Sequence, residues 1–411
     1  MKNKLDTIKN IREEYDNSFY IYDEKVISRQ VDSLLENFPD FEFLYSVKTN
    51  PFAPIVEYVV SRGFGADAAS AEEVMIARKA GLPYEKILYS TPGKTREDIK
   101  KTIDKALIIA DSYNELLLIN DIAKENHAHV KVGLRINMNF TMDGGSGISS
   151  QFGVDESTLV ENKGLFNSLT NVKISGIHVH LRSQVLDYKK LYNYYEKIFE
   201  LASYCIGELG WEMDFVNFGG GIGIVYSPRN DKELDIEKLG QKNQELIQRF
   251  KDKINARLII ETGRFVICEA GNYVTPIVDI KESMGRKYII VQKGLNGFLR
   301  PAIKELFLDY ASEDNLGKGS EPFYTTKDAF EFLIPDGDKS IQEKVTVVGS
   351  LCTATDTLAK DINLPKVEIG DTLIVTKAGS YAYSLSPVLF ANHDIPLQFY
   401  INKDGEVQYK E

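Results

Sequence analysis

Lys48 stands where an apolar run, 41–47 (FEFLYSV), gives way to a polar turn. Lysine is among the side chains that cost most to bury, so its place at the end of a strand-like run needs an explanation. Two interpretations are open from this stretch alone. The lysine is either a surface residue whose charged end reaches solvent, or an amine nucleophile at the mouth of a pocket, of the kind that forms a Schiff base.

Further side chains that could do chemistry lie at or near the ends of other apolar runs. Asp67 lies in the second run, His180 ends the sixth, and Glu261 ends the eighth. Each also has a plain structural interpretation, because a carboxylate can pair with a nearby cation and a histidine between apolar residues can belong to the core. Their shared position at the ends of strand-like runs favours a common site.

Two glycine elements follow the seventh and eighth runs: Gly219, Gly220 and Gly221 begin GGGIG, and Gly263 precedes Arg264 in ETGR. Backbone N–H groups can approach an anion closely where no Cβ intervenes. A bare glycine run is also compatible with a tight turn, and the dinucleotide-binding pattern GxGxxG is not matched.

Together, these groups are what pyridoxal phosphate needs. A lysine amine forms the imine, backbone amides hold the phosphate, a flat imidazole stacks on the ring, and a carboxylate keeps the pyridine nitrogen protonated. A protonated ring is the stronger electron sink, which favours formation of a carbanion at Cα.

The elements that must position these residues alternate between strand-like runs and segments of helical period, which is typical of a parallel sheet. The eight runs are 41–47, 64–68, 86–90, 106–110, 130–136, 174–180, 214–218 and 257–261. Helical segments are expected at 71–81, 95–105, 113–125 and 187–209. The pattern predicts a (β/α)8 barrel, with a doubly wound open sheet as the competitor. In a barrel, the active site lies at the carboxyl ends of the strands, and the loops after strands seven and eight often bind phosphate.

After about residue 270 the period changes, and short apolar runs recur without long helices. We expect a barrel at 24–270 and an antiparallel β-domain at 271–411, which the N-terminal segment 1–23 joins. The stretch 312–342 is polar and is predicted to be a loop. The Gly/Ser-rich loop 138–150 is too long for a simple connector and is either disordered or a lid.

Composition narrows the class of protein. A net charge of −11 argues against a nucleic-acid binder, because phosphate neutralisation needs clustered cations. The three widely spaced cysteines indicate a reducing, cytoplasmic setting. We expect no bound metal, no membrane span and no secretory signal.

The chain resembles the fold-type III pyridoxal-phosphate decarboxylases, the group of diaminopimelate and ornithine decarboxylases with an alanine racemase-like barrel. The resemblance runs from Phe19 to about Ile401. Its motifs are YSVKTN (45–50), GADAASAEE (65–73), LRIN (134–137), QFGVD (151–155), GIHVHLRSQ (176–184), NFGGGIG (217–223), ETGR (261–264), LNGFLRP (295–301), LCTATD (351–356) and AGSYAYS (378–384).

The resemblance implies a role for each matching residue. Lys48 is the Schiff-base lysine, His180 stacks on the cofactor, Glu261 meets the pyridine nitrogen, and Asp67 and Glu73 lie behind the ring. The residues expected at the phosphate are Gly219, Gly220, Gly221, Gly263, Arg264 and Tyr381. Those expected on the substrate side are Arg300, Thr353 and Asp356.

The resemblance further implies a homodimer in which Cys352 reaches the partner's site and protonates the carbanion after CO2 leaves. Diaminopimelate decarboxylases usually read HIGS and CESGD, where this chain reads HLRS (180–183) and CTATD (352–356). Their late arginine is also missing from 384–390. These departures fall on the substrate side and leave the cofactor set intact.

The pattern is closer to a specialised-metabolism branch that decarboxylates glutamyl-carrier proteins or citryl-diamino acids. We therefore expect α-decarboxylation of a conjugated or carrier-bound amino acid, in siderophore or antibiotic biosynthesis. meso-Diaminopimelate, with L-lysine as product, is the alternative substrate, and Arg300 supports it. Three other functions are open. A racemase would need a second base, a non-enzymatic cofactor carrier would not need the domain that holds Cys352, and a regulatory homologue would be expected to lose cofactor residues.

Overall fold

The computed structural model describes residues 2–310 and 322–409 of the chain. The chain divides into two compact units. We call them the barrel unit, which comprises Val31–Ile224 and Glu233–Gly263, and the β unit, which comprises Met1–Gln30, Val225–Lys232 and Arg264–Glu411. Each unit is described separately below.

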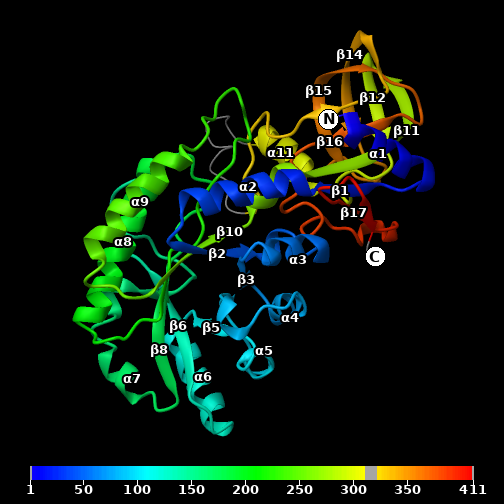
Figure 1. Cartoon of the computed structure of the whole chain (residues 1–411). Coiled ribbons are helices and arrows are strands. Elements are labelled where there is room, and N and C mark those ends of the chain that lie inside the picture. Colours follow the sequence, from blue (N-terminus) through cyan, green and yellow to red (C-terminus); the bar gives the residue numbers. More distant parts are fainter. Residues whose placement is uncertain (1, 311–321, 410–411) are drawn as a thin grey trace. The chain divides into compact units, whose positions relative to one another are not determined.

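The barrel unit is a closed ring of eight parallel strands in the order β2-β3-β4-β5-β6-β8-β9-β10, with β10 paired to β2 (Figure 1). The strands are β2 (Phe41–Ser46), β3 (Gly65–Ala68), β4 (Ile87–Tyr89), β5 (Leu107–Ala110), β6 (Val130–Asn137), β8 (Val172–His178), β9 (Phe215–Asn217) and β10 (Arg257–Thr262). Each overlaps one of the predicted runs, so the (β/α)8 barrel is confirmed and the open sheet is excluded. The short strand β7 (Val154–Asp155) adds to β6.

Helices precede and connect the barrel strands, and they include the four that were predicted at 71–81, 95–105, 113–125 and 187–209. They are α2 (Glu24–Asn37), α3 (Ala53–Ser61), α4 (Ala71–Lys79), α5 (Arg96–Thr102), α6 (Tyr113–Glu125), α7 (Lys163–Ser168), α8 (Tyr188–Gly207) and α9 (Ile236–Phe250). Several begin at a Ser, Thr or Asp whose side chain accepts a backbone N–H of the first turn, which satisfies a donor that the helix itself cannot. Helices α8 and α9 pack side by side outside the strands (Figure 1).

An aromatic side chain fills the inside of the barrel. Phe215 on β9 is fully buried and packs with aliphatic side chains of the neighbouring strands. Its ring occupies the space that a side chain would need at Gly133 on β6 and Gly176 on β8, where a Cβ would come within 2.8 Å and 2.4 Å of it. The two glycines therefore leave room for one large ring, which closes the interior as a packed core.

The β unit is a mixed sheet rather than the purely antiparallel one predicted. Its strands are β1 (Phe19–Asp23), β11 (Gly271–Ser283), β12 (Arg286–Val291), β13 (Phe332–Leu333), β14 (Asp338–Val348), β15 (Thr357–Lys366), β16 (Thr372–Val375), β17 (Leu397–Ile401) and β18 (Val407–Tyr409). The pairs β1–β17 and β12–β14 are parallel, and the other pairs in this sheet are antiparallel.

The β unit contains two helices that were not predicted, α10 and α11, and strands within a predicted loop. Helix α11 (Leu299–Tyr310) was not predicted, although the proline in its first turn is a known start signal. Of the predicted loop 312–342, residues 312–321 lie outside the described residues. The remainder contains β13 and the beginning of β14. The short helix α10 (Arg264–Ile267) follows the barrel's last strand.

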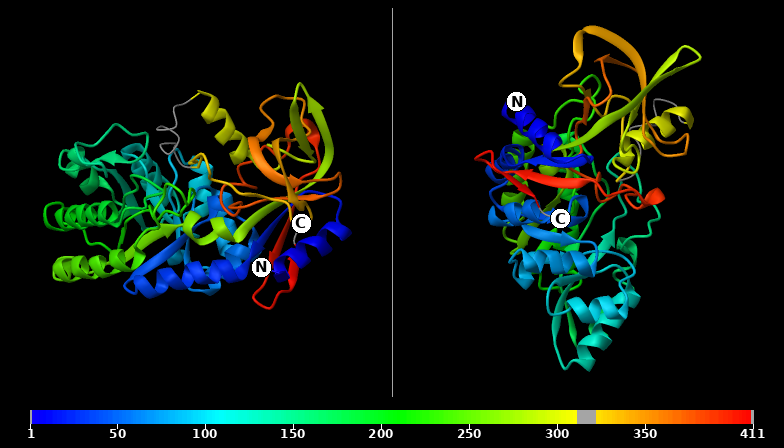
Figure 2. Two further views of the ribbon diagram at one scale, coloured as in Figure 1. Left: turned by 90° about the horizontal axis from the view of Figure 1, so that it is seen from above. Right: turned by 90° about the vertical axis from the view of Figure 1, so that its right-hand side faces the viewer.

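The two ends of the chain meet in the β unit, where the blue N-terminal helix and the red C-terminal strands lie together (Figure 2). Ile8 and Ile11 of α1 (Lys2–Glu14) pack in one cluster with Phe19, Phe399 and Ile401. Strand β1 lies between β11 and β17. The N-terminal segment is thus part of the core of this sheet.

Candidate active site

Lys48 lies in a short 3-10 helix, η1 (Val47–Thr49), directly after β2. The turn is fixed by Thr49, whose hydroxyl donates to the Ser46 carbonyl at 2.7 Å. Val47 and Thr49 are buried, whereas the Lys48 side chain is 44% exposed. A rigid turn at the carboxyl end of the barrel therefore holds one lysine with its amine accessible.

Three carboxyl groups, chiefly that of Asp67, affect the pKa of this lysine. Asp67 on β3 is fully buried, its Oδ2 lies 3.4 Å from Lys48 Nζ, and its Oδ1 accepts from the Ser90 hydroxyl at 2.6 Å. The negative charge of Asp67 raises the pKa of Lys48, and Glu261 and Glu73 add to the effect. Lys48 is therefore an ammonium ion at neutral pH in this structure.

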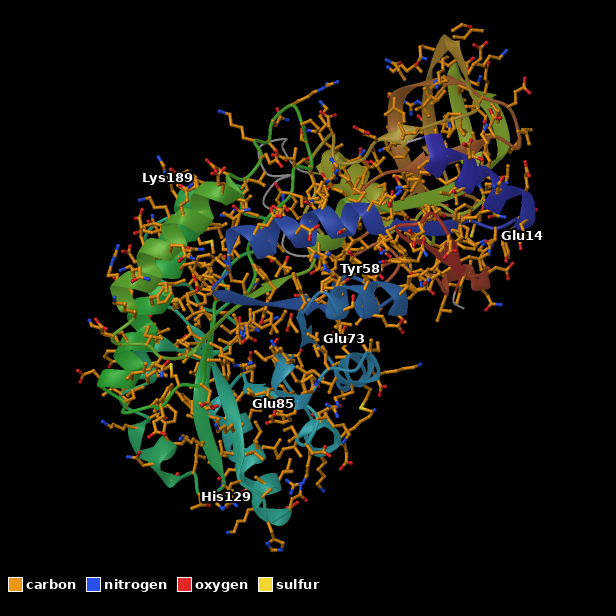
Figure 3. All side chains as sticks on the ribbon, viewed as in Figure 1. Glu14, Tyr58, Glu73, Glu85, His129 and Lys189 are labelled. Atoms are coloured by element: carbon orange, nitrogen blue, oxygen red, sulfur yellow. The ribbon has the colours of Figure 1, made fainter. Side chains whose placement is uncertain are left out.

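Glu73 stands in the first turn of α4 and is labelled in Figure 3. Its Oε2 accepts the Ala69 N–H at 2.7 Å, and its own N–H donates to the capping hydroxyl of Ser70 at 3.1 Å. Burial raises the pKa of Glu73 to about 7. This carboxyl group can therefore gain or lose a proton close to neutral pH.

His180, which follows β8, is oriented through both of its ring nitrogens. The Gly220 N–H donates to Nδ1 at 2.9 Å, and the Ser183 hydroxyl lies 3.3 Å from Nε2. Because Nδ1 accepts, the ring proton belongs on Nε2 and points to Ser183. Burial lowers the pKa of His180 to about 3, so the imidazole is neutral at physiological pH. A flat, neutral and fixed ring suits stacking on an aromatic cofactor.

Glu261 on β10 is a buried carboxylate, 4% exposed. Its Oε1 accepts from Asn217 Nδ2 at 2.8 Å and lies 3.2 Å from His178 Nε2. Burial by itself raises the pKa of Glu261, but the nearby His178 and Lys48 outweigh burial and leave this pKa well below its ordinary value. The ionised carboxylate could hold a proton on a pyridine nitrogen.

Two backbone amides of the glycine loop after β9 donate hydrogen bonds to side chains of the protein. Gly219 donates its N–H to Asn217 Oδ1 at 2.8 Å, and Gly220 donates to His180, as described above. The N–H groups of Gly221 and Gly263 meet no acceptor within the part of the chain that the structure describes. The amides open to an anion are therefore those of Gly221 and Gly263 rather than the whole predicted glycine run.

A Cβ has no room at Gly263. It would lie 2.3 Å from Cγ2 of Thr49, the residue after Lys48. The open amide of Gly263 and the turn that carries the lysine are thus packed against each other. Taken with the neutral histidine and the ionised Glu261, the residues of the barrel unit fit pyridoxal phosphate.

Three residues of the barrel mouth were missed as site residues in the sequence interpretation. His178 and Asn217 both contact the Glu261 carboxylate, and Arg135 at the end of β6 is buried, 3.4 Å from Asp111 and 4.4 Å above the Phe152 ring. Their positions at strand ends were a usable signal. The pairings themselves join distant parts of the sequence and depend on closure of the barrel.

The remaining predicted cofactor residues belong to the β unit. Arg264 begins α10 and is buried, with its guanidinium carbon 5.1 Å from the centroid of the Tyr381 ring. Tyr381 has a φ of 51°, in the left-handed region that side chains rarely adopt. Such strain often accompanies a functional side chain whose direction matters. The phosphate-binding roles of both residues stay predictions.

Arg300 is buried within the β unit, 1% exposed. Its Nη1 donates to the Ser380 carbonyl at 3.3 Å and its Nη2 to the Tyr324 carbonyl at 2.6 Å. The rings of Tyr226 and Phe330 lie 5.0 Å and 5.3 Å from the guanidinium carbon. A contact between Arg300 and substrate stays a prediction, and it would require these bonds to be exchanged.

The loop that carries Cys352 is organised by Asp356. Cys352 is exposed, whereas Asp356 is 2% exposed and accepts the N–H groups of Leu295 at 2.6 Å and Leu351 at 2.9 Å. Burial raises the pKa of Asp356. Because Asp356 accepts these two N–H groups, it holds the loop in place. Substrate binding by Asp356 and Thr353 stays a prediction.

Among the described residues, no group of three or more His, Cys, Asp or Glu side chains is arranged to hold a metal ion. No helix in the part of the chain that the structure describes is both long and apolar enough to cross a bilayer.

Comparison with known proteins identifies the family. Residues 24–268 match the pyridoxal-binding domain of the pyridoxal-dependent decarboxylases. The chain belongs to this family. The predicted family, enzyme class and cofactor, pyridoxal phosphate, are thereby confirmed.

Among curated relatives of this decarboxylase, the L-glutamyl-[BtrI acyl-carrier protein] decarboxylase of Niallia circulans is 30% identical over 408 residues, which cover 96% of this chain and 90% of that protein. The diaminopimelate decarboxylase of Aquifex aeolicus is 28% identical over 388 residues, covering 92% and 86%. Among solved structures, diaminopimelate decarboxylase from Helicobacter pylori complexed with L-lysine superposes with a TM-score of 0.82 at 25% identity, covering 98% of this chain and 95% of that one.

Proposed function

We propose that this decarboxylase removes the α-carboxyl group of an amino acid that is attached to a larger group, either a carrier protein or a conjugate, in siderophore or antibiotic biosynthesis. The observation that carries the choice of substrate is the state of Arg300. Its two terminal nitrogens already bind backbone carbonyls, so it does not present an open fork to a distal carboxylate. The relative that acts on a carrier-linked glutamyl group also supports this choice.

Bound pyridoxal phosphate supplies an aldehyde that takes up an amine and a ring that accepts electrons as CO2 leaves Cα. Lys48 provides the amine that holds the cofactor, and Asp67 compensates its charge. His180 would offer a neutral plane to the cofactor ring, and Glu261 would keep a proton on the pyridine nitrogen. The open amides of the glycine loops would hold the phosphate, and the same role is proposed for Arg264 and Tyr381.

Cys352 is the proposed proton donor to Cα after CO2 has left, and we propose that it serves the site of a second copy in a homodimer. Mixing the Lys48→Ala and Cys352→Ala variants, each inactive alone, tests this arrangement. Half of randomly formed dimers are hybrids with one intact site out of two, so roughly a quarter of the wild-type activity should return. Absence of any recovery after subunit exchange would contradict a shared site.

Free meso-diaminopimelate is the alternative substrate, because relatives with that activity are nearly as similar. The deciding experiment measures CO2 release by the purified holoenzyme from free diamino acids, a glutamyl-carrier protein, glutamyl conjugates and citryl conjugates. We expect kcat/KM for one attached substrate to exceed that for meso-diaminopimelate at least about tenfold, the effect of one differential polar contact. Preference for meso-diaminopimelate, with L-lysine as product, would overturn the proposed substrate class but leave the reaction type intact.

A further inference from the structure

Tyr226 follows the GGGIG loop in the sequence but belongs to the β unit, where it is fully buried. Its hydroxyl accepts a hydrogen bond from Arg264 Nη1 at 2.5 Å. Its backbone carbonyl accepts from Lys377 Nζ at 2.7 Å. One residue thus bonds to two cations through two different oxygen atoms.

Three cationic side chains also lie close to the aromatic ring of Tyr226. The guanidinium carbons of Arg264 and Arg300 lie 5.4 Å and 5.0 Å from its centroid, and Lys377 Nζ lies 5.7 Å away. All three distances fall within the range of cation–π attraction, which is strongest where water is excluded. Arg300 and Lys377 otherwise donate to backbone carbonyls. The aromatic ring is therefore an important source of negative potential for this cluster.

The direction of the hydrogen bonds around Tyr226 is fixed. Burial raises the pKa of its phenol, so the hydroxyl keeps its proton at physiological pH. Because Arg264 donates to the oxygen, the phenol proton is left for Cys268 Sγ at 3.3 Å. Cys268 in turn donates toward the Lys377 carbonyl at 3.5 Å. The hydrogen bonds from Arg264 through Tyr226 and Cys268 to the Lys377 carbonyl thus run in one direction, which restricts the orientation of the guanidinium.

We propose that Tyr226 is a positioning residue that aims Arg264 at the cofactor phosphate through its hydroxyl and holds Arg300 through its ring. This inference rests on the proposed phosphate-binding role of Arg264. It adds a residue that need not touch cofactor or substrate and that contacts both Arg264 and Arg300. The hydroxyl and the ring can be removed separately, so the two parts are separately testable.

The first variant is Tyr226→Phe, which removes the hydroxyl and keeps the ring. Apoenzyme is titrated with pyridoxal 5′-phosphate and, separately, with pyridoxal, which lacks the phosphate, and each dissociation constant is measured by absorbance. We expect affinity for pyridoxal 5′-phosphate to fall about tenfold, as for one lost hydrogen bond to a charged group, while affinity for pyridoxal is unchanged. Protection of the apoenzyme by inorganic phosphate against thermal unfolding should shrink in parallel.

The matched control is Tyr195→Phe. Tyr195 is also fully buried, and its hydroxyl has no hydrogen-bond partner among the described residues. Its loss should leave both dissociation constants unchanged. Tyr226→Leu, which also removes the ring, should additionally lower the thermal stability relative to Tyr226→Phe, because the Arg300 guanidinium then loses its aromatic partner.

Equal affinity of Tyr226→Phe and wild type for pyridoxal 5′-phosphate would overturn the inference, as would an equal loss for both ligands, which indicates a purely structural role. Arg264→Met provides the reference for phosphate binding. If that variant binds both ligands as wild type does, the proposed role of Arg264 fails and the inference about Tyr226 fails with it. If only Tyr226→Phe is silent, the role of Arg264 stands.

Discussion

The backbone N–H of Gly220 donates to Nδ1 of His180 at 2.9 Å, so the glycine loop holds the imidazole rather than offering this amide to a ligand. The bond places the ring proton on Nε2 and keeps the plane of the ring fixed. The stacking role predicted for His180 would be served by a ring that is both oriented and uncharged. One backbone amide contributes to both requirements.

Replacing Lys48 tests the assignment of the amine. Lys48→Ala should bind cofactor without the absorbance change of a covalent linkage, and activity should fall by about a thousandfold or more. Lys189→Ala is the control, because Lys189 is an exposed lysine on α8 (Figure 3). A normal absorbance change in Lys48→Ala would show that another residue supplies the amine.

Glu261→Gln separates the charge of this buried group from its shape. Gln cannot stabilise a protonated pyridine nitrogen, so kcat should fall at least about 100-fold while the cofactor still binds covalently. Stopped-flow or steady-state CO2 release measures the effect. Glu42→Gln is the matched control, because Glu42 pairs with Lys86 and Arg257 away from the strand ends of the site. Equal loss in both variants would assign Glu261 a structural role only.

Glu73 should make the stability of the apoenzyme depend on pH. Its pKa is about 7 in the folded protein against an ordinary 4.5, so the folded state binds the proton more tightly. Stability relative to the Glu73→Gln variant therefore falls as pH rises from about 5 to 7 and levels off above 7, with a slope of at most about 1.4 kcal/mol per pH unit for one proton. Thermal unfolding of both proteins at several pH values checks this. A pH-independent difference would mean that Glu73 is ionised throughout.

Gly263→Ala tests the close approach of two loops in the barrel unit. The new Cβ would lie 2.3 Å from Thr49 Cγ2, so we expect a loss of about 1–3 kcal/mol in stability and weaker cofactor binding. Gly164→Ala in α7 is the control, because a Cβ there meets no atom within 4 Å and alanine favours a helix. Denaturant unfolding of the two variants should give changes of opposite sign.

The barrel could be predicted from sequence because strands buried on both faces form short apolar runs, and chemistry follows them at one end. That rule located Lys48, Asp67, His180 and Glu261 together before any geometry was known. It could not show that His178 lies 3.2 Å from Glu261, since that pair forms only when β8 and β10 are brought together by the ring. The hydrogen bonds from the Gly219 and Gly220 amides to Asn217 and His180 could not be predicted either, because a glycine run in a sequence does not indicate the direction of its N–H groups.

In the β unit, local patterns located most strands but not their partners. Strands β12 and β14 can pair in parallel because helix α11 lies between them in the chain. This helix was not predicted from the sequence. The pairing of β1 with β17 joins the two ends of the chain, and no local signal specifies such a partner.

The position of β1 between β11 and β17 has a consequence for biosynthesis. The ribosome makes β1 before Val31–Gly263 and β17 after it. In a nascent chain the barrel can fold before either neighbour of β1 has been synthesised. Both edges of β1 are then unpaired, and unpaired strand edges can pair with other chains. Premature termination before Leu397 would leave one edge of β1 permanently open, so truncated products of this enzyme should aggregate even when their barrel is intact.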